Sequence, residues 1–188
     1  LFIKIFFNLS NFIFFPFKKV RDISVEKVES FGKNFDELWE NAKINNSFIA
    51  IRNHKYLNEL YSNKRFIKLK FMKKDKLIGW SISLCNKLEN HKQFGNMNLG
   101  SIVDCLSLKG YETSIIKKTD EILKKKGADL IVTNQSHVCW KNALKINSFI
   151  NGPSNFIFAS SVGLTKKLGV NKDFVHLTRG DGDGPIHL

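Results

Sequence analysis

Asp104 is the residue whose type and position most clearly suggest chemistry. It lies inside the apolar run "IVDCL" (102–106), which is typical of a buried strand. A buried carboxylate needs a partner or has a raised pKa, and such a group can deprotonate an amine directly or through a water molecule. The alternative is a carboxylate on the polar side of the strand, which faces solvent or a loop and has no catalytic role.

Cys105 and His137 raise the separate question of nucleophilic catalysis. A cysteine activated by a histidine can form a covalent intermediate, and His137 lies one element further along the chain. Because side chains alternate across a strand, Asp104 and Cys105 should face opposite sides of the sheet. This favours Cys105 as a small core residue. At the start of an expected helix, His137 is either a surface residue or a catalytic substitute.

The chain ends in "HLTRGDGDGPIHL", which contains two motif-like runs. Arg179-Gly180-Asp181 spells an adhesion tripeptide, which would require an extracellular protein, and nothing in the sequence indicates secretion. Asp181 to Gly184 resembles part of a calcium loop, but an EF-hand loop also needs a glutamate at its twelfth position. We expect glycine-permitted turns after a last strand. In these turns Arg179, Asp181 and Asp183 could bind a polar acceptor.

Composition and charge narrow the class of protein. The 188 residues suffice for one domain with a hydrophobic core. The net charge is +13, but lysine supplies almost all of it, and only Arg21, Arg52, Arg65 and Arg179 are arginines. Base readout and bidentate phosphate contacts favour arginine, so we expect no nucleic-acid partner. Widely spaced cysteines without a CxxC pair exclude zinc ribbons and redox motifs and favour a reduced, cytoplasmic location.

The most apolar stretch is "LFIKIFFNLSNFIFFPF" (1–17). It is shorter than the roughly 20 apolar residues of a membrane span, is interrupted by polar residues, and lacks the cleavage site of a signal peptide. We interpret 1–25 as an apolar and basic linker or tail that packs on a part of the protein upstream of Leu1, and 26–188 as one domain. A helix in contact with a membrane surface through 1–21 and a truncated span are the alternatives.

Hydrophobic periodicity predicts the elements that position these residues. Apolar residues with helical spacing indicate helices within 30–43, 54–63, 111–126 and 136–149. Alternation indicates a hairpin at 66–85, followed by a polar connection at 87–98 and buried strands at 99–108 and 129–134. The strand, helix and strand over 99–134 predict a parallel crossover. Short runs at 47–53, 155–161 and 173–178 are further strand candidates.

This order of elements resembles the GNAT acyltransferase fold over residues 48–178. "GADLIVTN" (127–134), a helix and then "LKINSF" (144–149) are similar to the second half of that family, where a helix closes on a Gly-Phe pair. Ser148 stands in place of the glycine, and Phe149 keeps the aromatic residue. The resemblance implies an α/β (α+β) fold with a mixed, mostly antiparallel sheet, one parallel strand-helix-strand crossover, and helices on both faces.

A closer resemblance is to GNAT-like proteins that are associated with bacterial surface-polysaccharide genes and contain two GNAT-like halves. Their second half has a Phe…Asp-x-Leu-Trp helix, an Arg-Asp-x-x-Tyr-Leu segment and a Thr-Arg-Gly-Asp-x-Asp-Gly tail. The matching segments here are 35–39, "RNHKYL" (52–57) and 178–184. The resemblance implies that this chain is a C-terminal half whose partner is a missing N-terminal GNAT-like half.

Members of this family transfer an acetyl group from acetyl-CoA to an amine, and here the acceptor could be an amino sugar or another cell-surface precursor. Pantetheine binds to free backbone groups of the strand before the crossover helix, and the pyrophosphate binds at that helix's N-terminus. Asn134 or His137 could replace an asparagine that holds the cofactor. The resemblance therefore implies cofactor contacts from Leu106, Leu108, Lys109, Gly110, Thr113, Ser114 and Asn134.

Two departures from the family pattern support an alternative, a catalytically degenerate half that binds a ligand or supports a partner domain. The turn "SLKGYETS" (107–114) lacks Gly-x-Gly, and Glu112 would repel phosphate while capping the helix. Leu144 occupies the position of the family's proton-donating tyrosine and cannot donate a proton. The resemblance also implies that the last strand runs antiparallel to 129–134, which would place the tail at the sheet edge opposite the phosphate.

Overall fold

The main sheet is mixed and mostly antiparallel. The computed structural model describes residues 20–92, 94–152, 159–168 and 172–182, and within them the strand order is β1-β3-β4-β5-β6. The strands are β1 (Ser24–Lys27), β3 (Ile67–Lys73), β4 (Lys76–His91), β5 (Gly95–Ser107) and β6 (Leu130–Thr133). All neighbours pair antiparallel except β5 and β6, which are parallel. This arrangement confirms the expected fold class.

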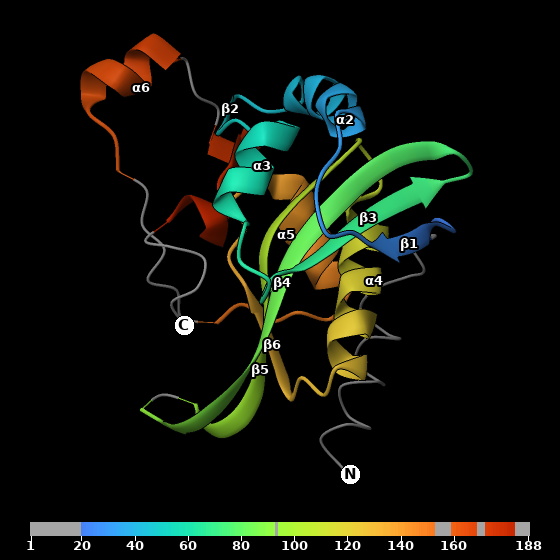
Figure 1. Ribbon diagram of the computed structural model, residues 1–188. Helices are drawn as coiled ribbons and strands as arrows, with labels where there is room; N and C mark the ends of the chain where they lie inside the picture. Colours follow the sequence, from blue (N-terminus) through green and yellow to red (C-terminus); the bar gives the residue numbers. More distant parts are fainter. Residues whose placement is uncertain (1–19, 93, 153–158, 169–171, 183–188) are drawn as a thin grey trace.

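Helices cover both faces of the sheet (Figure 1). α2 (Asn34–Lys43) and α3 (His54–Leu60) pack on one face, and α4 (Glu112–Lys125) and α5 (Val138–Ile146) pack on the other. α6 (Val162–Leu168) stands apart from the sheet (Figure 1). Two short strands, β2 (Phe48–Ile49) and β7 (Val175–His176), form a separate parallel pair.

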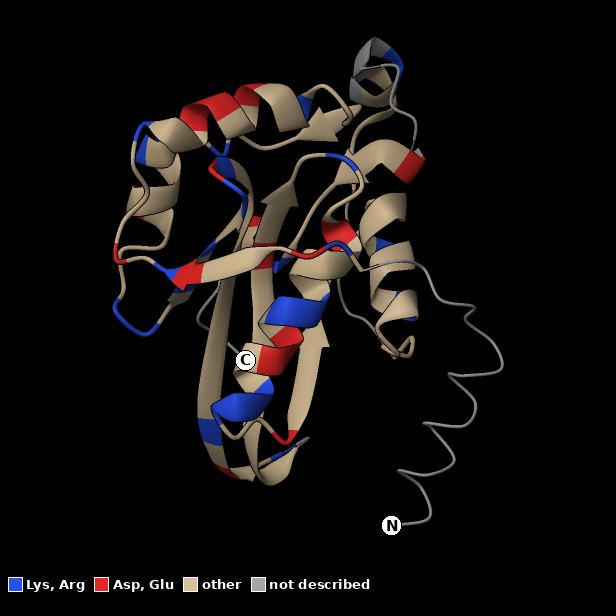
Figure 2. Ribbon diagram, turned by 90° about the vertical axis from the view of Figure 1, so that its right-hand side faces the viewer, with Lys and Arg blue, Asp and Glu red and all other residues tan. Residues whose placement is uncertain are grey.

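The amphipathic spacing of the sequence explains how the helices sit. The apolar side of α2 is buried with Trp80 at the centre of the sheet, and the apolar side of α4 is buried on the opposite face. Lysines and acidic residues share the outer side of α4 (Figure 2). α4 ends before Gly127, whose φ of 86° is the left-handed conformation typical of a glycine that terminates a helix.

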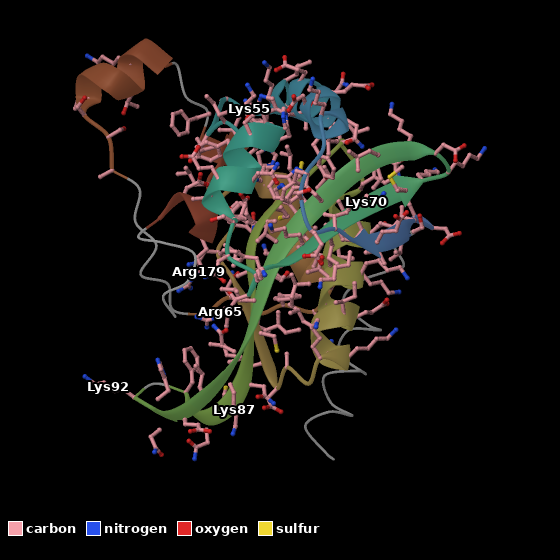
Figure 3. All side chains as sticks on the ribbon, viewed as in Figure 1. Lys55, Arg65, Lys70, Lys87, Lys92 and Arg179 are labelled. Carbon is pink, nitrogen blue, oxygen red and sulfur yellow. The ribbon has the colours of Figure 1, made fainter. Side chains whose placement is uncertain are left out.

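The expected polar connection at 87–98 is wrong. β4 continues to His91 and β5 begins at Gly95, so this region is the outer part of one long hairpin. None of its described residues is buried, because this part of the hairpin extends beyond the helices and both of its sides face solvent. Lys87 and Lys92 lie on this projecting part (Figure 3). Without a buried side, the segment has no period-two hydrophobic pattern that would indicate a strand.

The structure also bears on the expected domain boundary, on the burial of β6 and on the expected strand at 155–161. The boundary expected between residues 25 and 26 falls inside β1. β6 is less buried than expected, since Leu130 is 40% exposed. The apolar run 1–17 and residues 155–158 of the expected strand 155–161 lie outside the described residues, and 159–161 are not part of a strand. No helix in the described part of the chain combines the length and the apolar composition needed to cross a bilayer.

The last strand differs most from expectation. β7 pairs with β2 instead of extending the main sheet. One antiparallel bridge, Gln135 to Thr178, keeps the expected direction relative to the end of β6. The chain then turns toward β5, so the segment 178–182 contacts Asp104 and does not lie at the opposite sheet edge. The prediction of a remote tail is therefore wrong.

Candidate functional site

Asp104 faces α3 because β5 contains a β-bulge. Ile82 pairs with Asp104 and the next residue, Ser83, pairs with Ile102, so Val103 is an extra residue in β5. A bulge places two successive side chains on the same side of a strand. Val103 packs in the core under α2 and α3, and Asp104 points to the same side. Cys105 packs in the opposite core under α4 and α5, which confirms the expected separation of these two residues.

Arg52 is the main partner of Asp104. Both side chains are 1% exposed, and Arg52 Nε donates to Asp104 Oδ2 at 3.0 Å and to Oδ1 at 3.2 Å. The other two nitrogens of the guanidinium donate to the Ala50 carbonyl at 2.9 Å and to Asp181 Oδ2 at 2.5 Å. A planar guanidinium can serve several acceptors at once, so one arginine joins β5, the residues before α3, and the tail.

Both carboxylate oxygens of Asp104 accept hydrogen bonds from other groups of the protein. Oδ2 accepts a hydrogen bond from the Tyr61 hydroxyl at 2.8 Å. Oδ1 accepts from the Thr178 hydroxyl at 3.0 Å and from the backbone N–H of Cys105 at 2.8 Å. This carboxylate is therefore held in place by protein donors and has no free acceptor site for a substrate in this arrangement.

The tail contributes through a capped turn, η2 (Arg179–Asp181). The Thr178 hydroxyl accepts from the Gly180 N–H, and Asp181 Oδ2 accepts from the Thr178 N–H at 2.8 Å, which makes a capping box. Asp181 pairs with Arg52 rather than with Arg179. Arg179 is half-buried, and Asp183 lies outside the described residues. Because Gly180 is buried and Asp181 is paired, this tripeptide is not presented for adhesion.

Burial and charge shift several pKa values in this network. Burial raises the pKa of Asp104, although Arg52 opposes that shift. Burial also raises the pKa of Tyr61 well above its ordinary value, and the charge of Asp104 adds to the effect. Burial alone would lower the pKa of Arg52, but the two carboxylates raise it above its ordinary value. Arg52 is therefore charged, and Tyr61 is a neutral donor.

The turn at the N-terminus of α4 is already occupied by groups of the chain itself. Glu112 Oε2 accepts from the Gly110 N–H at 2.8 Å, and the Ser114 hydroxyl accepts from the Arg21 N–H at 2.9 Å. Arg21 also stacks over the Tyr111 ring at 4.5 Å and lies against Gly110, which has φ 88°. Burial raises the pKa of Glu112, while the Gly110 N–H, Arg21 and Lys109 oppose that shift.

The remaining predicted cofactor residues are near the ends of β5 and β6. Leu106 is buried in the core, Lys109 is exposed, and the Leu108 N–H donates to the Ile78 carbonyl. The Thr113 carbonyl accepts from Asn147, which ties α5 to α4. Asn134 follows β6 and lines a cleft along that strand. Leu108, Lys109 and Gly110 thus form the connection from β5 to α4, and both backbone groups of Leu108 have partners within the chain, Ile78 and Tyr111, instead of being free for a cofactor.

His137 is a helix cap in this structure. Its Nδ1 accepts from the Cys139 N–H at 3.1 Å at the start of α5. Burial lowers its pKa, so the neutral ring that this cap requires is the favoured form at neutral pH. The ring lies 6.2 Å from that of His176, whose own pKa is lowered by burial and by Arg52. His137 therefore packs behind the network and does not bond to Asp104.

Sequence reasoning missed the roles of Arg52, Tyr61 and Thr178 in the network. All three lie in or next to segments that carried the resemblance, the run 52–57 and the tail. A usable signal was the scarcity of arginine in a lysine-rich chain, since burying a cation with several partners favours arginine over lysine.

In the first matching segment, 35–39, Asp36 connects α2 to the start of α3. Its carboxylate accepts from the backbone N–H of His54 at 2.8 Å and bonds to the ring at 2.7 Å.

Solved structures share this architecture. A ribosomal-protein-alanine N-acetyltransferase from Brucella melitensis biovar Abortus matches with a TM-score of 0.53 and 11% identity over 74% of this chain and 100% of that chain. A GNAT family acetyltransferase from Staphylococcus aureus matches with a TM-score of 0.50 and 15% identity, with the same coverage. The chain has the GNAT fold.

The shared fold does not by itself assign an activity. A transcriptional regulator from Bacillus halodurans also matches this chain, with a TM-score of 0.53 and 9% identity over 74% of this chain and 100% of the regulator. The sequence matches no protein-family model and no curated protein. Function therefore has to be argued from the site.

Proposed function

We propose that the chain is a GNAT-type acyltransferase that transfers an acetyl group from acetyl-CoA to an amine acceptor. The observation that carries this proposal is the opening between β5 and β6. The two strands pair from Leu99 and Leu130 to Ile102 and Thr133, and β5 then continues to Ser107 without a described β6 partner. An extended amide chain such as pantetheine can bind to strand backbone that is not already paired.

β5 is followed by a short connection and then by the N-terminus of α4, where the proposal places the phosphates of the cofactor. The connection from β5 enters α4, whose first N–H groups and dipole favour negative charge. Lys109 and Arg21 add positive charge at the same turn. A phosphate would have to replace the Glu112 carboxylate at the Gly110 N–H.

The amine acceptor would enter from the side of α2 and α3, to which Asp104 points. We propose an amino sugar or another surface-polysaccharide precursor. The proposal is supported by the resemblance of 35–39, 52–57 and the tail to proteins associated with surface-polysaccharide genes. An N-terminal GNAT-like half as partner is part of the same proposal. Asp104 could act as a base only after at least one of its present hydrogen-bond donors moves away.

A second candidate function is a non-catalytic GNAT-like half that binds a ligand or supports a partner domain. It is favoured because groups of this chain already form hydrogen bonds with the atoms that a cofactor or an acceptor was expected to contact. The Gly110 N–H, the Ser114 hydroxyl and both oxygens of Asp104 all have partners within the chain. Leu144 also provides no proton donor at the position where the family has a tyrosine.

An acetyl-transfer assay separates the two candidates. We expect the purified chain to release free CoA thiol from acetyl-CoA in the presence of an amino sugar. The release should be faster than when either the amino sugar or the protein is left out. Asp104→Asn should reduce that release at least tenfold, whereas Asp75→Asn, in the exposed turn between β3 and β4, should leave it unchanged. If no amine across a panel of amino sugars and amino acid amides accelerates thiol release, the non-catalytic function is the better account.

A further inference from the structure

We propose that residues 178–182 form a latch that closes the α2/α3 side of the opening between β5 and β6 and controls access to Asp104. This inference does not depend on acetyl transfer, because it concerns how any ligand reaches the carboxylate. Its basis is the position of the turn, the fit of Gly180, and the way in which Asp181 is held.

The latch spans the two strands where they separate. Thr178 forms an antiparallel bridge with Gln135, just after β6, and its hydroxyl donates to Asp104 on β5 at 3.0 Å. The Gln135 amide crosses to the Cys105 sulfur at 3.4 Å, which links the same two strands on the other side. The turn therefore covers the α2/α3 side of the opening beside the candidate base, and together with Arg52 and Tyr61 it surrounds the carboxylate of Asp104, which is 1% exposed.

The latch has a close fit that only glycine allows. A Cβ on Gly180 would overlap the Tyr61 hydroxyl oxygen and would lie 3.4 Å from Asp104 Oδ2. The capping box of Thr178 and Asp181 joins residues within the turn itself, so it does not depend on docking. A preformed turn loses little conformational entropy when it closes, so the chain can adopt the closed position readily.

The latch can detach while the ion pair between Arg52 and Asp104 stays intact. Arg52 binds Asp104 through Nε, and it binds Asp181 through a different nitrogen, Nη2. When Asp181 leaves, one arginine and one aspartate stay paired. Asp181 is 11% exposed, whereas Arg52 is 1% exposed, so the detachable carboxylate is at the outer side of the network. The sequence of 179–182 contains no apolar side chain, so these four residues insert no apolar side chain into the core that would hold the latch closed.

Hydrogen exchange and carboxylate labelling test the latch in the full chain. We expect the amides of 178–182 in the wild type to exchange at least tenfold faster than those of central β4. Asp181→Asn should accelerate them at least tenfold further, with β4 unchanged, and Asp75→Asn should have no effect. Labelling of Asp104 by a carbodiimide and glycinamide, measured by mass spectrometry, should be at least fivefold faster in Asp181→Asn than in the wild type. Latch amides as slow as those of β4, or unchanged Asp104 labelling, would overturn the proposal.

A second pair of variants tests the fit without changing charge. Gly180→Ala should expose the latch amides, because the added methyl overlaps the Tyr61 oxygen. Tyr61→Phe in the same chain removes that oxygen and should restore at least part of the protection. If the double variant exchanges as fast as Gly180→Ala alone, the latch is not seated on Tyr61 and the proposal fails.

Discussion

Replacing Arg52 by methionine is expected to lower the free energy of unfolding by about 3–5 kcal/mol. The substitution keeps much of the side-chain volume but leaves Asp104 buried beside Asp181 with no positive charge between them. Urea unfolding with linear extrapolation measures the change. Arg65→Met is the matched control, because the Arg65 side chain is at the surface and donates an exposed hydrogen bond to Asn86, and we expect it to cost less than about 0.5 kcal/mol.

The destabilisation in Arg52→Met should depend on pH with a defined sign. Burial already raises the pKa of Asp104, and Arg52 is the main group that lowers it, so the variant raises this pKa further. The folded state then holds a proton that the unfolded state releases. The stability from that proton is fully present below the ordinary aspartate pKa of 3.8 and is lost as pH rises through the folded value. The destabilisation should therefore shrink as pH falls from about 7 toward about 4, and a pH-independent difference would contradict a buried charge as its cause.

Gly79→Ala is expected to cost about 1–3 kcal/mol, which is typical of overpacking in a core. Gly79 lies in β4 where α4 packs directly on the sheet, and a Cβ there would overlap Ile115 Cδ1 and lie 2.7 Å from the Leu106 carbonyl oxygen. The isoleucine tip can rotate, but the carbonyl belongs to β5 and cannot. Relief therefore requires α4 or β5 to move, and that movement would also displace the turn at the start of α4.

The matched control for this change is Gly152→Ala. Among the described residues, no heavy atom lies within 4 Å of the position of that Cβ, so we expect a change of less than about 0.5 kcal/mol. Urea unfolding of both variants gives the comparison. Equal stabilities of the two variants would show that the contact between β4 and α4 has room for a methyl group.

Periodic patterns predicted most of the fold, because burial on one side imposes a period on the sequence. The apolar faces of α2 and α4 and the parallel pairing of β5 with β6 followed from such patterns. The outer part of the β4–β5 hairpin was missed because it has no buried side. The position of β7 was missed because the pairing of a two-residue strand depends on tertiary contacts rather than on its own sequence.

The site was predictable by residue type but not by geometry. Asp104 was identified because a carboxylate inside an apolar strand needs a partner, and the structure supplies that partner in Arg52. Nothing local to residue 104 indicates a bulge, so the face to which its side chain points could not be derived. The contact of the tail with Asp104 joins residues 74 positions apart, and no local pattern encodes such a separation.

Calorimetric titration of acetyl-CoA into the full chain tests the proposed acyltransferase most directly. We expect saturable binding at one site. Glu112→Gln, which removes the negative charge beside the Gly110 N–H, should bind about tenfold more tightly, as expected for a charge at a helix N-terminus. Absence of heat with millimolar acetyl-CoA in both proteins would contradict the acyltransferase proposal and leave the non-catalytic function in its place.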